Sequence, residues 1–159
     1  MRIRLLATAI LSTALLAPLV PSRAADVPMT GDTAEAAQVW TTFEHWLKAY
    51  EAGDLDGIMA IFDRDVIFEF QGGPDANADM LRRDYAADLK ARAAGTRWVP
   101  RVEEVHADGN TAFVRSMWEL HVGDKVTQRN RSMDVFQRRD GRWNILRSIN
   151  YPAKARAAC

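Results

Sequence analysis

Residues 46–62 read WLKAYEAGDLDGIMAIF and join the end of one predicted helix to the start of another. Apolar residues recur at steps of three and four on both sides of Gly53, which is typical of amphipathic helices. Gly53 can adopt the left-handed conformation that ends the first helix, and the Asp54 side chain can cap the second. The stretch therefore predicts two consecutive helices that meet at Gly53, the second one short and extending to Phe62.

Upstream, the first helix has a clear start signal. Asp32 and Glu35 have the spacing of a capping box, in which an acceptor side chain is followed three residues later by a carboxylate. From there to Gly53 the apolar stripe is heavily aromatic. We therefore predict a long helix from Asp32 to Gly53 with an aromatic buried face.

Downstream, the pattern predicts one strand, one helix and then strands only. Residues 66–70 are β-branched and aromatic, and a third helix is predicted from its cap Asn77 to Gly95. From Thr96 the apolar period changes to two, which predicts strands over 96–105, 111–122, 126–138 and 142–151. This order indicates an α+β fold, with three helices packed on one face of a curved, mostly antiparallel sheet.

The N-terminus has the pattern of a secretory signal peptide. Arg2 and Arg4 precede an apolar run, and small residues stand before the expected cleavage point after Ala24. An uncleaved membrane anchor is disfavoured because polar residues and Pro18 interrupt the run. We expect a periplasmic or secreted protein without a membrane anchor. Its predicted parts are a signal peptide (1–24), a flexible mature N-terminus (25–31), one domain (32–152) and a C-terminal tail (153–159).

Composition and charge argue against several classes of function. The chain has 21 basic and 21 acidic residues, and loss of the three leader arginines leaves a net charge of about −3, so no nucleic-acid partner is expected. Cys159 is the single cysteine, which rules out an intrachain disulfide. His45, His106 and His121 lie on different predicted elements without metal-binding spacing, so no metal site and no cofactor are expected.

Three stretches together resemble one known family. Residues 46–62, residues 65–70 (DVIFEF) and residues 133–143 (MDVFQRRDGRW) are similar to the ketosteroid isomerase and SnoaL-like superfamily, which has the cone-shaped nuclear transport factor 2-like fold. The resemblance covers nearly the whole mature chain. It implies a conical pocket between helices and sheet that holds a small apolar molecule. It also implies a homodimer through the outer sheet face, to which the mixed strand face of Arg115, Met117, Glu119 and His121 belongs.

The resemblance does not extend to all the catalytic positions of the family. Aligned without gaps from Gly53, the base position of the steroid isomerases falls on Phe70 and their tyrosine position on Trp46. Phenylalanine has no proton to exchange, and an indole donates a hydrogen bond but does not titrate usefully. Among these positions, Asp134 alone matches an acid of the family, the aspartate on a late strand. The resemblance thus implies the conical pocket of the family, which we call the cup, without the usual catalytic residues of its isomerases.

Asp134 is the main candidate site residue because aspartate is disfavoured inside a strand and needs compensation there. It is either a pocket acid or the partner of an arginine such as Arg131 or Arg147. By the resemblance, Leu146, Ser148 and Asn150 alternate on the pocket face of the last strand. The candidate ligand-binding residues, for whose aromatics core packing is the alternative, are Trp46, Tyr50, Phe70, Tyr85, Trp118, Phe136, Ser148 and Asn150.

Three functions stay open at this point. The first is an exported protein that binds a small apolar molecule. The second is an enzyme of the isomerase, dehydratase or cyclase type, with Asp134 as acid and Tyr50 or His45 as its partner. The third is a non-catalytic structural dimer whose cup is filled by its own side chains. A cavity separates the first two from the third, and a second titratable group facing the ligand separates the enzyme from the binding protein.

Overall fold

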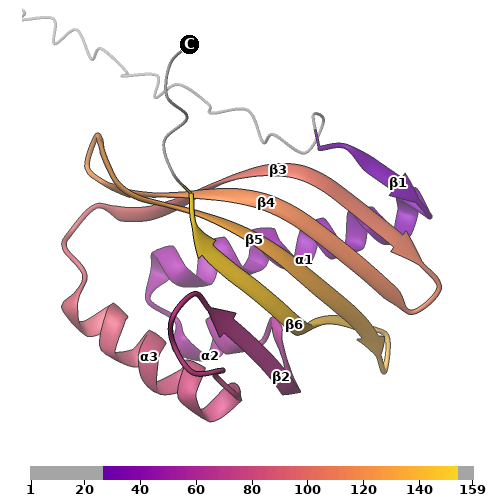
Figure 1. The fold of residues 1–159 in the computed structure, drawn as a ribbon, viewed down its shortest axis with the longest axis horizontal. Helices are drawn as coiled ribbons and strands as arrows, with labels where there is room; N and C mark the ends of the chain where they lie inside the picture. The colour runs from indigo at the N-terminus through magenta and orange to yellow at the C-terminus, as the bar shows by residue number, and fades with distance from the viewer. Residues whose placement is uncertain (1–26, 154–159) are drawn as a thin grey trace, which may run out of the picture.

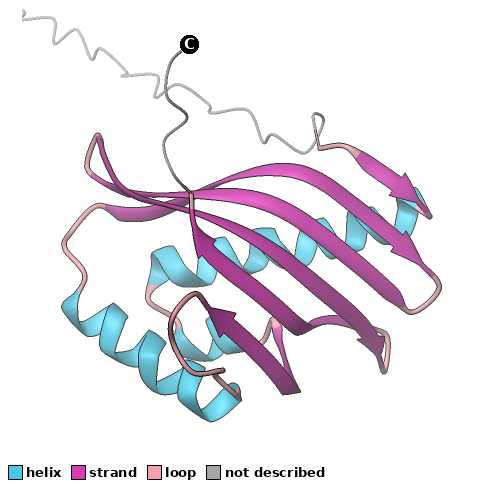
Figure 2. Ribbon diagram, viewed as in Figure 1, coloured by secondary structure: helices cyan, strands magenta, loops and turns pink. Residues whose placement is uncertain are grey.

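The structure, a computed structural model, describes residues 27–153, so the predicted signal peptide lies outside the described residues. The elements follow in the order β1 (Met29–Gly31), α1 (Thr33–Ala52), α2 (Leu55–Met59), β2 (Phe62–Phe70), α3 (Ala78–Ala91), β3 (Thr96–Asp108), β4 (Thr111–Val122), β5 (Lys125–Arg139) and β6 (Arg142–Pro152). The helices cover one face of the curved sheet and leave the other face open (Figures 1 and 2). The predicted α+β class is confirmed. No helix in the described part is long and apolar enough to cross a membrane.

The sheet has six strands in the order β1-β3-β4-β5-β6-β2. Strands β3 to β6 form the predicted antiparallel meander. The two outermost strands pair in parallel, β1 with β3 and β2 with β6. The expectation of a mostly antiparallel sheet is therefore confirmed, with parallel pairs at both edges.

Capping residues and glycines in the sequence predict both ends of α1 correctly, but they do not predict the C-terminal ends of α2 and α3. The Asp32 side chain accepts hydrogen bonds from the backbone N–H groups of residues 34 and 35, and Gly53 ends α1 at a φ of 74°. The prediction that the second helix extends to Phe62 is wrong, because Phe62 already belongs to β2 and pairs with Ile145. The third helix ends at Ala91 and not near Gly95, because the backbone of the next residue, Arg92, is extended.

Residues Met29–Gly31 form a strand that the sequence pattern does not predict. Met29–Gly31 forms β1 inside the segment expected to be flexible, and Thr30 Oγ1 lies 2.9 Å from His106 Nδ1 across the pair. Gly31 has a φ of 70°, and a Cβ there would lie 2.1 Å from the carbonyl oxygen of Ala107. A three-residue strand gives no apolar alternation, so only its pairing with β3 reveals it.

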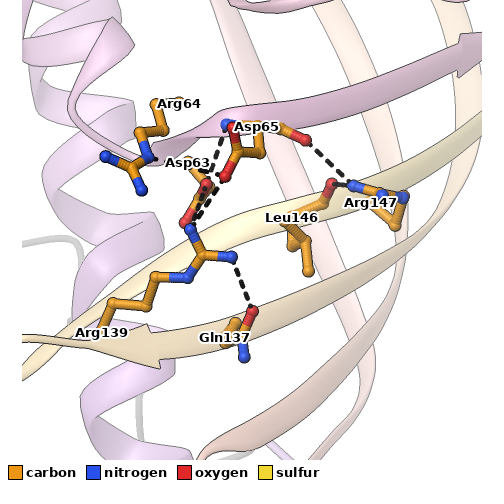
Figure 3. Close-up of polar contacts among 7 residues, drawn as sticks. All are labelled: Asp63, Arg64, Asp65, Gln137, Arg139, Leu146 and Arg147. Atoms are coloured by element: carbon orange, nitrogen blue, oxygen red, sulfur yellow. Dashed lines mark hydrogen bonds and ion pairs between the residues drawn. The ribbon is translucent and has the colours of Figure 1, made fainter.

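Ion pairs and a hydrogen bond connect the start of β2 to the end of β5 and to β6 (Figure 3). Arg139 Nη1 lies 3.3 Å from Asp63 Oδ1 and 3.1 Å from Asp65 Oδ2. Arg147 Nη1 donates a 3.0 Å hydrogen bond to the backbone carbonyl of Asp65. The buried Asp63 carboxylate is thus matched by a cation, and β2 is held at the edge of the sheet where one wall of the cavity described below begins.

Candidate functional site

A cavity of about 220 Å³ lies between the helices and the inner face of the sheet. Side chains from α1, β2, α3, β3, β4, β5 and β6 line it, so the whole fold contributes to one site. Eight of the lining residues are aromatic, which makes the cavity mostly apolar. Small-molecule sites are typically apolar hollows with a few placed polar groups, and this cavity has that character.

Seven aromatic rings form a continuous chain of contacts around the cavity, which we call the aromatic wall. Successive ring centroids lie between 4.7 and 6.4 Å apart, within the range of attractive aromatic pairs. In order of contact the members are Phe70, Phe68, Phe62, Tyr85, Trp46, Trp118 and Trp98. The predicted aromatic stripe of α1 thus supplies one of seven members, and the sheet and α3 supply the rest.

Asp134 lies on the inner face of β5 and is only 3% exposed. Its carboxylate accepts a hydrogen bond of 2.8 Å from Ser132 Oγ and one of 2.5 Å from Ser148 Oγ. The alternative of an ion pair with Arg131 or Arg147 is not what the structure has. Arg131 pairs with Glu103 on the outer face, and Arg147 bonds the backbone of β2. Asp134 is therefore a polar member of the cavity lining and not a sheet ion-pair partner.

The two serines beside Asp134 are themselves held by donors. Trp118 Nε1 donates to Ser132 Oγ at 3.1 Å, and Asn150 Nδ2 donates to Ser148 Oγ at 2.8 Å. Indole and amide N–H groups can only donate, so each serine oxygen accepts there and directs its own hydrogen to Asp134. The result is a hydrogen-bond network across β4, β5 and β6 that ends at the Asp134 carboxylate.

Burial changes the acidity of two groups in the cavity. Loss of contact with water raises the pKa of Asp134 to about 6, although the hydrogen bonds from Ser148 and Ser132 oppose the rise. Burial also raises the pKa of the Tyr85 hydroxyl above its usual range, and the negative charge of Asp134 adds to the effect. Asp134 therefore changes its charge near neutral pH, whereas Tyr85 stays protonated.

The structure brings most of the predicted site residues together. Six of the nine candidates line the cavity, namely Asp134, Trp46, Phe70, Tyr85, Trp118 and Asn150. The other three do not line it. Tyr50 is buried, and its hydroxyl donates a 2.7 Å hydrogen bond to Asp88. Phe136 packs edge-on against Phe43, with ring centroids 5.2 Å apart. Ser148 donates a hydrogen bond to Asp134 from beneath the lining. The structure places these three buried side chains behind the lining, where other side chains cover them.

Several polar lining residues were missed by sequence reasoning. Asp84 and Asp88 on α3 lie one turn apart on either side of Tyr85, but neither belongs to the apolar stripe that predicts the buried face of this helix. Gln128, Asn130 and Ser132 also line the cavity. The signal that could have found them is the run of polar residues at every second position of the strand that leads to Asp134.

The suggested catalytic partners of Asp134 do not lie in the cavity. Tyr50 is held by Asp88, and His45 lines a separate hollow between α1 and the turn before β6. Within residues 27–153 no group of three or more histidine, cysteine, aspartate or glutamate side chains is arranged to hold a metal ion. The acid–base groups that the cavity does present are Asp134, Tyr85, Asp84 and Asp88.

Comparison with known proteins gives one family and many similar folds. The family model described as the SnoaL-like domain matches residues 43–145. No curated protein sequence matches significantly. A domain of unknown function with a cystatin-like fold from Nostoc punctiforme has a TM-score of 0.67 and 15% identity, with 79% of this chain and 81% of that chain covered.

Two further solved structures carry family descriptions. An NTF2-like protein of unknown function from Pseudomonas putida has a TM-score of 0.63 and 17% identity, over 77% of this chain and 89% of that chain. A ketosteroid isomerase-like protein from Erwinia carotovora atroseptica has a TM-score of 0.60 and 18% identity, over 76% of this chain and 98% of that chain. At these identities the likeness shows the shared fold alone.

Proposed function

The chain belongs to the SnoaL-like domain family, as the resemblance of residues 46–62 predicted, and from this premise we propose that it binds a small, mostly apolar molecule in its cavity. The observation that carries the proposal is the cavity of about 220 Å³ that the aromatic wall lines. An apolar cavity of about 150 Å³ holds benzene, so this one suits a ligand of roughly ten non-hydrogen atoms. The cavity gives no support to the alternative of a structural dimer whose cup is filled by its own side chains.

The proposal is tested by removing one ring of the aromatic wall. Phe70 is 42% exposed at the cavity, so Phe70→Ala should cost little stability and weaken the binding of benzyl alcohol about fivefold to tenfold, the loss expected for one aromatic contact. Isothermal titration calorimetry measures the affinity. Ile67→Ala is the matched control, since Ile67 lies on the same strand, is 39% exposed and does not line the cavity. Equal losses in both variants, or no saturable binding to the wild type, would contradict the proposal.

We also propose that the protein works in the periplasm or outside the cell. The support is the sequence of the N-terminus, with Arg2 and Arg4 before an apolar run and small residues up to Ala24. N-terminal sequencing of protein recovered from the cell envelope decides this. A mature chain that still begins at Met1 would contradict export with cleavage.

An enzyme of the isomerase, dehydratase or cyclase type is the second candidate. Asp134 favours it, because a carboxyl group whose pKa is raised to about 6 and which lines an apolar cavity is suited to proton transfer near neutral pH. Tyr85 and Ser132 are the hydroxyl donors on the lining, and Ser132 already donates to Asp134. Turnover of a bound compound that is lost in Asp134→Asn, while binding of that compound is kept, would favour this candidate over binding alone.

We further propose that a second copy of the chain packs on the outer face of the sheet. Four large apolar side chains are exposed there on three adjacent strands, and Met133 of β5 pairs with Ile149 of β6. The other two are Ile67 and Tyr151. On neighbouring β4 the predicted mixed face is present, but Glu119 is already paired with Arg129 and His121. An apolar patch of this kind supports a symmetric contact, in which it meets its own copy.

The dimer is tested by placing a charge in this patch. Ile149→Glu should convert a dimer into a monomer, because the buried carboxylate would meet its own copy across the two-fold axis. Light scattering at a protein concentration of about 50 µM measures the mass of the particle. Gln38→Glu, which adds the same charge on the exposed side of α1, should leave the dimer intact. A wild-type monomer at this concentration would contradict the proposal.

A further inference from the structure

The buried Asp134 carboxylate lacks a counter-charge from the protein. It is 3% exposed and is hydrogen-bonded by Ser132 and Ser148, which are both neutral. Within the described chain no lysine, arginine or histidine forms an ion pair with it or lines the cavity. Buried carboxylates in proteins are normally paired with a cation, because an isolated buried charge costs several kcal/mol or more. The protein supplies hydrogen bonds for Asp134 but not the charge that would balance it.

The hydrogen-bond network around Asp134 is arranged for the ionised carboxylate. Each carboxylate oxygen receives one serine hydrogen, and the indole of Trp118 and the amide of Asn150 direct those hydrogens by donating to the serines. Hydrogen bonds donated to a carboxylate favour its charged form. Each oxygen also keeps capacity for a further donor, since a carboxylate offers about four acceptor positions.

The other charges at the cavity have the same sign. Asp84 and Asp88 line it from α3, four residues apart on one face of the helix. The lining therefore carries three carboxyl groups and, among the residues that the structure describes, no cationic side chain. A cleft lined by charges of one sign concentrates ligands of the opposite sign.

The aromatic wall attracts cations as well as apolar groups. The face of an aromatic ring carries partial negative charge and attracts a desolvated cation placed over it. The three indoles are set nearly at right angles, with interplanar angles of 76° between Trp46 and Trp118 and 88° between Trp98 and Trp118. Three indoles in different orientations thus line the same cavity as Asp134.

We propose that the ligand of this cavity is a small organic cation, an amine with an apolar body, whose ammonium group binds Asp134 and whose body packs on the aromatic wall. The inference rests on the proposed function and names the chemical class of its ligand. A neutral ligand with an oxygen acceptor would instead need a protonated Asp134 as donor, and the carboxyl groups of Asp84 and Asp88 would not attract it as they attract a cation.

Two probes of equal size test the inference. Benzylamine is a cation at pH 7.5, and benzyl alcohol is its neutral counterpart with the same number of non-hydrogen atoms. Titration calorimetry on the full mature chain should give at least tenfold tighter binding of benzylamine at pH 7.5. That advantage should disappear in Asp134→Asn and should shrink severalfold in Asp84→Asn. Asp140→Asn, which removes one carboxylate from the exposed turn between β5 and β6, is the control and should bind both probes like the wild type.

The dependence on pH separates the two possible states of Asp134 without any variant. Benzylamine should bind more weakly as the pH falls from 7.5 to 5, because protonation removes the charge that it meets. A ligand that needs a protonated Asp134 would bind more tightly over the same range. Benzyl alcohol that binds as tightly as benzylamine at pH 7.5 would overturn the inference and leave the proposed function standing. Binding of neither probe would overturn both.

Discussion

Replacing Phe136 by alanine should lower the free energy of unfolding by about 3 to 5 kcal/mol and leave the affinity of the cavity for benzyl alcohol within about twofold. Phe136 has no exposed surface and packs edge-on against Phe43, so the truncation creates a void inside the core. The residue does not line the cavity. Denaturation by urea gives the stability, and calorimetry on the folded variant gives the affinity.

The partially exposed Phe70 gives the opposite pattern and is the matched comparison for Phe136. The same truncation at Phe70 should reduce binding and change the stability by less than about 1 kcal/mol, because that ring is already partly in water. A Phe136→Ala variant with near-native stability, or one whose binding falls as much as that of Phe70→Ala, would show that the division between core and cavity is misplaced.

The ligand-free protein should lose about 2 kcal/mol of stability through Asp134 as the pH rises from 4 to 7.5. The pKa of Asp134 is about 6 in the folded protein, against an ordinary value of 3.8, so the folded state holds this proton more tightly than the unfolded state. Its contribution to stability is therefore fully present below about pH 4, where both states are protonated. It is lost as the pH rises to and through the folded-state pKa, because a buried charge must then form.

The measurement compares the wild type with Asp134→Asn over this range of pH. Other carboxylates act in the opposite direction, since the arginine partners of Asp65 and Glu119 lower the pKa of both groups. Subtracting the two stability curves removes these shared contributions. The wild type should weaken relative to Asp134→Asn as the pH rises, whereas Asp140→Asn should run parallel to the wild type. A flat difference curve for Asp134→Asn would mean that burial does not raise the pKa of Asp134.

The parts of the fold that the sequence predicted correctly depend on local chemistry. The cap at Asp32, the left-handed stop at Gly53 and the hairpins between β3 and β6 are decided by residues close in the chain. The two parallel pairs at the edges of the sheet are not decided by nearby residues. β1 has three residues, and β2 finds its place only through pairing with β6 and contacts such as that of Arg139 with Asp63.

The expected pocket face of the last strand, formed by Leu146, Ser148 and Asn150, assumes uninterrupted alternation, and the structure interrupts that alternation. The register of β5 and β6 shifts between Val135 and Phe136, so that Val135 pairs with Arg147 and Phe136 with Ile145. The intervening Leu146 has no partner in this ladder, and Ile145 lines the cavity where Leu146 was expected. A β-bulge of this kind reverses which residues face inward, and nothing in the local sequence announces it.

How deeply an inward side chain lies behind the cavity surface is the second property that the sequence pattern does not predict. Side chains alternate between the two faces of a strand, which predicts Phe136 and Asp134 on the same face of β5. Both are buried, yet of these two only Asp134 lines the cavity. Tyr50 follows the helical stripe of Trp46, but its hydroxyl is taken by Asp88 from another helix. Which inward side chains line the cavity and which are covered depends on packing between elements that are distant in the chain.

The parallel pairing of β2 with β6 has a consequence for how the chain folds. The contact between Arg147 and Asp65 closes a loop of 82 residues, and β6 is the last element of the sheet to be synthesised. Contacts of such high separation form slowly, because the entropy of closing the loop is lost before the pairing is gained. On the ribosome, β2 and β5 would therefore wait with bare edges until β6 emerges between them. Chains that stop before Arg142 should expose both edges and aggregate through them, so the same final strand completes the cavity and protects the chain from aggregation.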